Sequence, residues 1–213
     1  MNYHALVFDL DGTLIDSSSL MVNAFNHALS PFNIKISAKE VEEMRSLSSG
    51  ELFRDILSEE QSREALTRLW SYSRQSVPDT LLIEGIQALL QQVESKNIIM
   101  GLWTGRDTSS AIEILKHHNI DNYFKAIVGG SEVSKNKPHP EGLFLLAQKL
   151  NISLDLLIHI GDHDHDLIGA KEAGAASILV EWCPQDVINQ NSHLANYTFK
   201  SVHAFSSWID TIN

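Results

Sequence analysis

The stretch ALVFDLDGTL, residues 5–14, decides the fold. Its first four residues form an uninterrupted apolar run, which is typical of a strand buried on both faces of a sheet. The run stops at Asp9, and the polar residues that follow it up to Thr13 indicate a loop. The stretch therefore predicts a buried strand whose carboxyl end carries acidic side chains.

Further apolar runs of the same kind recur along the chain, with helical patterns between them. These runs are residues 98–103, 156–160 and 176–180, together with the shorter run 126–128. The helical patterns begin near Asp107 and cover residues 143–150 and 167–174. Because strands that alternate with helices form βαβ units, the sequence predicts an α/β fold with a Rossmann-like parallel sheet.

Residues 17–79 have a different pattern, with helical stretches and no convincing strand. The helical stretches are Leu20–Leu29, Lys39–Leu47, Leu52–Leu57 and Arg63–Tyr72. Polar or proline-containing segments at 16–19 and 77–80 suit hinges. We therefore expect a core domain of residues 1–16 and 80–213 and an inserted small helical cap domain of residues 17–79. The alternative is that these helices simply pack on the sheet.

Composition and charge exclude several classes of protein. The chain has 213 residues, is 43% hydrophobic and 20% charged, and has a net charge of -11, which argues against a non-specific nucleic-acid binder. Its single cysteine, Cys183, excludes an internal disulfide framework and fits a reducing compartment. No apolar segment reaches the roughly eighteen residues of a membrane span, and the first residues lack a secretory signal. We expect a cytoplasmic monomer or homodimer that binds neither nucleic acid nor membrane.

Reactive residues follow three of the predicted strands. Asp9 and Asp11 follow the first strand, Thr104 follows the second, and Asp162 follows the third. Ligands of an open parallel sheet collect at the carboxyl ends of its strands, so these residues and Lys137 are expected at one edge. Converging carboxylates repel each other unless a cation lies among them, and Mg²⁺ is the usual cation beside phosphate oxygens. The pattern predicts a site for a phosphoryl group.

These motifs, in this order, resemble those of the haloacid dehalogenase-like hydrolase superfamily. The motifs are Asp9-Leu10-Asp11-Gly12-Thr13-Leu14, Thr104, Lys137-Pro138 and Gly161-Asp162 with Asp166. The helical insert after the first motif looks like the small cap of the branch that includes phosphoglycolate phosphatase and β-phosphoglucomutase. The resemblance spans nearly the whole predicted core and is far more specific for the superfamily than for any substrate.

The resemblance implies a role for each carboxylate. Asp9 would be the nucleophile that forms an aspartyl-phosphate, and Asp11 would be the general acid and then the base that activates water. Asp9, the backbone carbonyl of Asp11, and Asp162 would hold Mg²⁺. Asp166 would be an outer partner or an occasional ligand of the metal and would orient Lys137.

The remaining candidate residues would bind the substrate. Thr104, Gly105 and Lys137 would bind the phosphoryl oxygens. In related caps a polar loop reaches the leaving group, so Arg45 would bind a second anion, although an ordinary helix–helix turn is nearly as good an interpretation of its segment. Arg106 is interpreted as a surface residue, with contact to the far end of the substrate as the alternative.

The segment His163-Asp164-His165 departs from the usual family pattern, in which a small hydroxyl residue often follows the first aspartate. One interpretation is a softer metal such as Zn, Mn or Co, because imidazole suits these metals better than Mg²⁺. The other, which we favour, is that both histidines face solvent or the next loop. Trp103, before Thr104, also differs from the commoner forms.

The function predicted is an Mg²⁺-dependent phosphatase that acts on a small phosphorylated metabolite through Asp9. A sugar phosphomutase of the β-phosphoglucomutase type is the nearest alternative. A dehalogenase is disfavoured because Asp11 is present and halide leaves without a proton donor. A non-enzymatic phospho-acceptor of the response-regulator receiver type would share the acidic cluster, threonine and lysine, but it lacks an insert of sixty-odd residues after its first strand.

Overall fold

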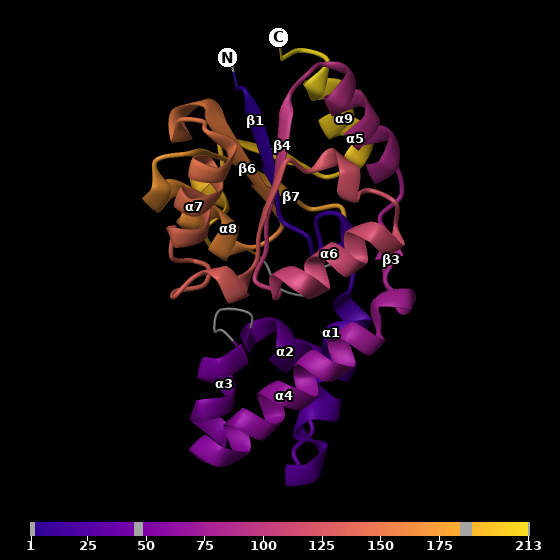
Figure 1. Cartoon of the computed structure of the whole chain (residues 1–213), viewed down its shortest axis with the longest axis vertical. Helices are drawn as coiled ribbons and strands as arrows, with labels where there is room; N and C mark the ends of the chain where they lie inside the picture. Colours follow the sequence, from indigo (N-terminus) through magenta and orange to yellow (C-terminus); the bar gives the residue numbers. More distant parts are fainter. Residues whose placement is uncertain (1–2, 45–48, 184–188, 213) are drawn as a thin grey trace. The chain divides into compact units, whose positions relative to one another are not determined.

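A computed structural model describes residues 3–44, 49–183 and 189–212 (Figure 1). The described residues form two compact units. The larger unit comprises the residues up to Asp16 and those from Leu81 onward, and the smaller unit is Ser17–Thr80. Within the described ranges, no helix combines the length and the apolar character that crossing a bilayer requires.

The larger unit is built on a sheet of six strands in the order β5-β4-β1-β6-β7-β8. Every neighbouring pair in this sheet is parallel, which confirms the predicted α/β fold class. The strands are β1 (Ala5–Phe8), β4 (Ile99–Trp103), β5 (Ala126–Val128), β6 (Leu157–Gly161), β7 (Ala176–Val180) and β8 (Tyr197–Phe199). The central strand β1 pairs with β4 and β6, so Ala5 lies opposite both Ile99 and Leu157.

Both faces of the sheet are covered by helices, which explains why its strands read as continuous apolar runs. Alternate residues of β1 point to opposite faces, and all four are fully buried. Val7 packs in one apolar cluster with Trp103, whereas the ring of Phe8 contacts Phe124 and Phe205 on the other side. Helices α7 (Glu141–Leu150) and α8 (Asp164–Ala173) cover the first face. Helices α5 (Ile86–Ser95) and α9 (Val202–Ile209) cover the second (Figure 1).

The connections between the units are paired with each other at the border of the larger unit. The short strands β2 (Ile15–Asp16) and β3 (Leu81–Leu82) pair antiparallel where the chain leaves the larger unit and returns to it. The backbone N–H of Ile83 donates to the carbonyl of Leu14 beside them, at 3.0 Å. The segment that leaves the larger unit and the segment that returns to it are therefore hydrogen-bonded to each other within that unit.

The described part of the smaller unit is helical. Its helices are α1 (Ser18–Leu29), α2 (Ala38–Met44), α3 (Ser49–Ile56) and α4 (Glu59–Gln75). Leu29, Phe53 and Ala65 are fully buried in its own apolar core. A capping box between Ser58 and Gln61 starts α4 well before the apolar repeat that the sequence analysis used. That this unit acts as a cap stays a prediction.

Helix α6 (Thr108–His117) follows β4 and completes the regular helices of the described chain. Short 3₁₀ turns lie at Ser30–Phe32, Val77–Asp79, Asp121–Tyr123, Gly130–Glu132, Leu154–Leu156 and Ser192–Leu194.

Candidate active site

The candidate site lies where β1, β4 and β6 end. Asp9 is the first residue after β1, Thr104 the first after β4, and Asp162 the first after β6. Because these strands are parallel neighbours, their carboxyl ends share one edge of the sheet. The structure brings together Asp9, Asp162 and Asp166, all buried, each with a carboxylate oxygen within 4.8 Å of those of the others.

Two glycines allow the carboxylates to lie this close to the backbone. Gly12 has a φ of +79°, and a Cβ there would lie 2.1 Å from Oδ2 of Asp162. A Cβ on Gly161 would lie 2.2 Å from the carboxyl carbon of Asp166. Any side chain at either position would displace an acidic group of the site, so both positions require glycine.

Lys137 neutralises part of this acidic cluster. Its Nζ donates to Oδ1 of Asp9 at 2.7 Å, to Oδ1 of Asp166 at 2.6 Å and to the backbone carbonyl of Trp103 at 2.8 Å. The ammonium also lies 4.6 Å from the centre of the Trp103 ring, a cation–π arrangement. All three N–H groups of the buried ammonium therefore have acceptors.

The charges of the cluster are unequally compensated. Burial raises the pKa of Asp9 to about 8, and Asp166, Asp162 and Asp11 add to that rise although Lys137 opposes it. Burial also acts to raise the pKa of Asp166, but Lys137 and His159 outweigh it and hold that pKa well below its usual range. Burial alone would lower the pKa of Lys137, whereas Asp166 and Asp9 raise it above its usual value. Lys137 thus pairs with both Asp166 and Asp9, and it compensates the burial of Asp166 more fully than that of Asp9.

These observations fit a divalent cation. The three carboxylates Asp9, Asp162 and Asp166 offer hard oxygen ligands at short separation, which is the donor set that Mg²⁺ prefers. Burial and the neighbouring carboxylates raise the pKa of Asp9 although Lys137 opposes that rise, which is compatible with a further positive charge at the site. The site could therefore hold Mg²⁺, with Asp9 and Asp162 as ligands. Asp166, which accepts from Lys137, would lie next to the metal.

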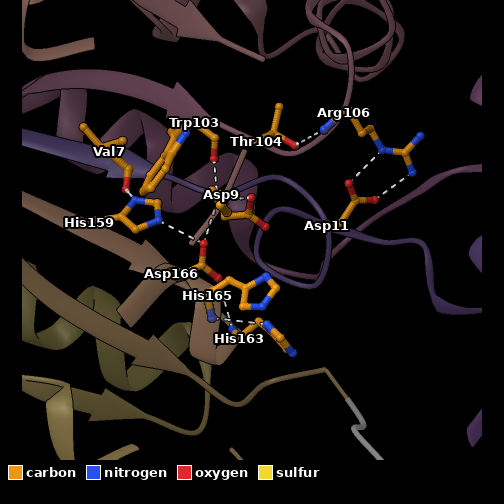
Figure 2. A network of polar contacts seen from close by, with 11 residues as sticks. Val7, Asp9, Asp11, Trp103, Thr104, Arg106, His159, His163, His165 and Asp166 are labelled. Carbon is orange, nitrogen blue, oxygen red and sulfur yellow. Dashed lines mark hydrogen bonds and ion pairs between the residues drawn. The ribbon is translucent and has the colours of Figure 1, made fainter. Parts of the chain in front are cut away.

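Asp166 is held by three groups of the protein (Figure 2). Its Oδ1 accepts from Lys137 and lies 3.0 Å from Nε2 of His159, and its Oδ2 accepts from the backbone N–H of His163 at 3.1 Å. Burial lowers the pKa of His159. His159 was not predicted as part of the site, because its apolar neighbours in β6 are typical of a buried core strand.

Asp11 lies apart from the three-carboxylate cluster and pairs with Arg106 (Figure 2). The guanidinium is bidentate: Nε donates to Oδ2 of Asp11 and a terminal nitrogen donates to Oδ1, each at 2.7 Å. The side chains of Arg106 and Asp11 are only 17% and 13% exposed. Burial would lower the pKa of Arg106, but Asp11 outweighs it and raises that pKa. The interpretation of Arg106 as a surface residue was wrong.

Thr104 and Gly105 form the loop after β4. Thr104 is buried, its backbone N–H donates to Val128 at 3.1 Å, and its Oγ1 accepts from the backbone N–H of Arg106 at 3.2 Å. That acceptor role leaves the hydroxyl hydrogen of Thr104 for another acceptor. A Cβ on Gly105 would meet nothing within 4 Å, whereas one on Gly130 would lie 2.6 Å from the carbonyl oxygen of Gly105.

The remaining predicted residues lie outside the cluster or outside the described chain. The rings of His163 and His165 contact each other edge to face, with centres 4.7 Å apart. His163 is the N-cap residue of α8, and its Nδ1 accepts from the backbone N–H of His165 at 3.2 Å. Neither belongs to the metal-compatible group found among the described residues, which gives the softer-metal interpretation no support. Arg45 lies outside the described residues.

Comparison with known proteins gives concordant matches over most of the chain. Residues 6–180 match the model of the haloacid dehalogenase-like hydrolase family. Pyrophosphatase PpaX of Oceanobacillus iheyensis is 24% identical over 202 residues, which cover 95% of this chain and 94% of the relative. Phosphoglycolate phosphatase of Shigella boydii is 29% identical over 200 residues, 81% of this chain and 79% of the relative.

The fold has close counterparts among solved structures. A predicted phosphatase from Clostridium acetobutylicum aligns over 100% of both chains with a TM-score of 0.88 and 25% identity. CbbY from Rhodobacter sphaeroides, in complex with phosphate, aligns over 93% of this chain and 94% of its own with a TM-score of 0.81 and 18% identity. At that identity the second match concerns the fold alone.

Proposed function

The chain belongs to the haloacid dehalogenase-like hydrolase family, and from this premise we propose that it is an Mg²⁺-dependent phosphatase. Its substrate is a small phosphorylated metabolite, and the reaction passes through an aspartyl-phosphate on Asp9. The observation that carries the proposal is the buried ammonium of Lys137 between Asp9 and Asp166, beside Asp162. Such a site combines a nucleophile with fixed positive charge, as phosphoryl transfer requires.

Asp9 supplies the nucleophilic oxygen. In the first step this oxygen forms a bond to phosphorus while the bond to the ester oxygen of the leaving group breaks. Asp9 attacks only as the anion, and burial holds its pKa near 8 in the protein alone. Mg²⁺, when bound, supplies the positive charge that favours the ionised carboxylate and neutralises the phosphoryl oxygens.

Asp11 handles the protons of both steps. As an acid it gives a proton to the departing ester oxygen, and as a base it then takes a proton from the water that attacks the aspartyl-phosphate. Arg106 holds both oxygens of Asp11 and so favours its ionised form, which is the form that activates water. The first step needs the protonated form, so in this proposal Arg106 releases Asp11 when the substrate enters.

Thr104 and Lys137 hold the transferring group. The hydroxyl of Thr104 keeps a hydrogen for a phosphoryl oxygen, and the backbone of Gly105 lies next to it in the same loop. Lys137 exchanges part of its contact with Asp9 for a phosphoryl oxygen and keeps its contact with Asp166. The ammonium thereby stays beside the phosphoryl group as that group moves from the substrate to Asp9.

The names of the relatives and the organisation of the chain support the proposed substrate class. The relatives are named for a small phosphorylated acid and for pyrophosphate, and neither name involves a polymer. Residues 17–79 act as a cap in this proposal, and Arg45 within them binds a second anionic group of the substrate. The lone cysteine and the net charge of -11 suit a cytoplasmic enzyme that does not bind nucleic acid.

A panel of phosphorylated metabolites tests the proposal. Inorganic phosphate is measured after incubation of each compound with the purified chain and Mg²⁺, and again with excess chelator. We expect turnover with Mg²⁺, loss with chelator, and loss in Asp9→Asn but not in Glu94→Gln, which changes an exposed acid. Sugar-phosphate isomerisation without phosphate release would favour the phosphomutase, and a single equivalent of phosphorylation without turnover would favour a phospho-acceptor.

A further inference from the structure

His159 is a polar residue at the centre of the buried strand β6. It lies between Ile158 and Ile160, and its exposed fraction is 0%. Burying a polar side chain costs free energy unless its groups are hydrogen-bonded. An apolar residue would serve the core at this position, so the contacts of the imidazole indicate what it contributes.

The imidazole makes three close contacts (Figure 2). Its Nδ1 lies 2.9 Å from the backbone carbonyl of Val7 in β1, and its Nε2 lies 3.0 Å from Oδ1 of Asp166 in α8. One side of the ring packs against Trp103 of β4, with ring centres 4.8 Å apart. Both polar neighbours are acceptors, and a neutral imidazole has a single N–H. Because a carboxylate is a stronger acceptor than a carbonyl, we expect that N–H on Nε2, where it donates to Asp166.

The contact with Asp166 reaches Lys137 directly. The carboxylate oxygen next to His159 is the one that accepts from Nζ of Lys137, at 2.6 Å. The other oxygen of Asp166 is held by the backbone N–H of His163. With both oxygens held by the protein, the carboxylate cannot rotate without losing a contact. Lys137 then has a fixed acceptor on one side and Asp9 on the other.

Trp103 contacts the ammonium of Lys137 in two ways. Its ring lies under the ammonium of Lys137, and its backbone carbonyl accepts from the same nitrogen. Two helical glycines make room for this large ring. A Cβ on Gly142 would lie 2.1 Å from its Nε1, and one on Gly169 would lie 2.6 Å from its Cη2. Glycines in α7 and α8 thus leave space for the ring of Trp103.

We propose that His159 is a positioning residue that, packed against Trp103, holds the carboxylate of Asp166 and through it the ammonium of Lys137 in contact with Asp9. The proposal rests on the proposed phosphatase function, in which Lys137 serves the transferring phosphoryl group. His159 touches neither the substrate nor the reacting atoms. Its effect is on the turnover step rather than on substrate binding.

Two variants of matched shape separate positioning from packing. His159→Gln and His159→Met have unbranched side chains of similar length, but only glutamine can donate an N–H toward Asp166. We expect His159→Met to lower kcat by about 10–100-fold with KM changed less than about 3-fold. We expect His159→Gln to retain kcat within about 3-fold of the unmodified enzyme.

Thermal unfolding of the same proteins establishes that both variants are folded at the temperature of the assay. Among folded variants, equal kcat values for His159→Met and His159→Gln would overturn the positioning role, because only glutamine can donate an N–H toward Asp166.

Crystal structures of both variants test the proposal independently of activity. We expect the 2.7 Å contact between Lys137 and Asp9 to persist in His159→Gln and to be lost in His159→Met. An unchanged contact in His159→Met would overturn the proposal even if the enzyme had no activity on any phosphorylated compound. Absence of turnover in the unmodified chain would instead contradict the phosphatase function. Should a His159 variant fail to fold, Trp103→Phe is expected to lower kcat in the same direction, and an unchanged kcat there would count against the proposal.

Discussion

Replacing Lys137 by methionine should destabilise the protein by an amount that depends on pH. The ammonium is the partner of two buried carboxylates, those of Asp9 and Asp166. Removing one member of a buried ion pair typically costs about 3–5 kcal/mol, because it leaves an uncompensated buried charge. The pH dependence follows from how the protein relieves that charge.

In Lys137→Met we expect Asp166 to fold in its protonated form. Its pKa in the folded state then rises above the value near 3.9 that it has in the unfolded chain. At any pH between these two values the folded state binds a proton that the unfolded state has lost, so stability falls as pH rises. Holding that proton costs about 1.36 kcal/mol per pH unit above 3.9, which is about 1.5 kcal/mol at pH 5 and about 4 kcal/mol at pH 7.

Urea unfolding in the presence of chelator measures both values. The loss in the free energy of unfolding is larger at pH 7 than at pH 5. With a slope near 2–3 kcal/mol per molar urea, this difference lowers the urea midpoint of the variant, relative to that of the unmodified chain, by about 1 M more at pH 7 than at pH 5. Lys135→Met is the matched control, because Lys135 is exposed and two residues away. A loss of the same size at both pH values, or a loss no larger than that of Lys135→Met, would refute the assigned ion pairs.

Three further predictions follow from the same site. Gly142→Ala should destabilise the protein by about 1–3 kcal/mol, although alanine normally favours a helix, because its Cβ would lie 2.1 Å from Nε1 of Trp103. The loss of stability should be smaller in a Trp103→Phe background, and fully additive losses in urea unfolding would contradict this contact. Because burial raises the pKa of Asp9 to about 8, stability in chelator should fall as pH rises from about 5 to 8, and Asp9→Asn should flatten that fall. Arg106→Met should free Asp11 to take up a proton and shift the alkaline limb of the pH profile of kcat upward, whereas an unchanged profile would count against the pair.

The strands of the sheet could be predicted closely from the sequence. Strands such as β1 and β7 are buried on both faces, so each reads as an uninterrupted apolar run with clear ends. The strand β8 was missed because its three residues are partly or fully exposed and carry no such run. The helix α4 was predicted too short, since its first turn is defined by the cap at Ser58 and not by apolar spacing.

The site could be predicted only where strand ends and motifs mark it. Asp9 and Asp162 follow strands that share an edge, so their convergence follows from the parallel sheet. The pair between Arg106 and Asp11 joins residues 95 positions apart, and no local pattern signals it. His159 is hidden for a different reason: its side chain belongs to an apolar run, and only the packing of α8 on β6 brings Asp166 to it.

The central claim is that Asp9 carries the phosphoryl group, and Asp11→Asn makes that intermediate observable. This variant keeps the nucleophile but lacks the base that activates water, while p-nitrophenolate leaves without needing a proton. With p-nitrophenyl phosphate and Mg²⁺ we expect a burst near one equivalent, then slow turnover, and mass spectrometry should find one phosphoryl group on the peptide that contains Asp9. A phosphoryl group on His163 or His165, or a burst that persists in the double variant Asp9→Asn/Asp11→Asn, would contradict the claim.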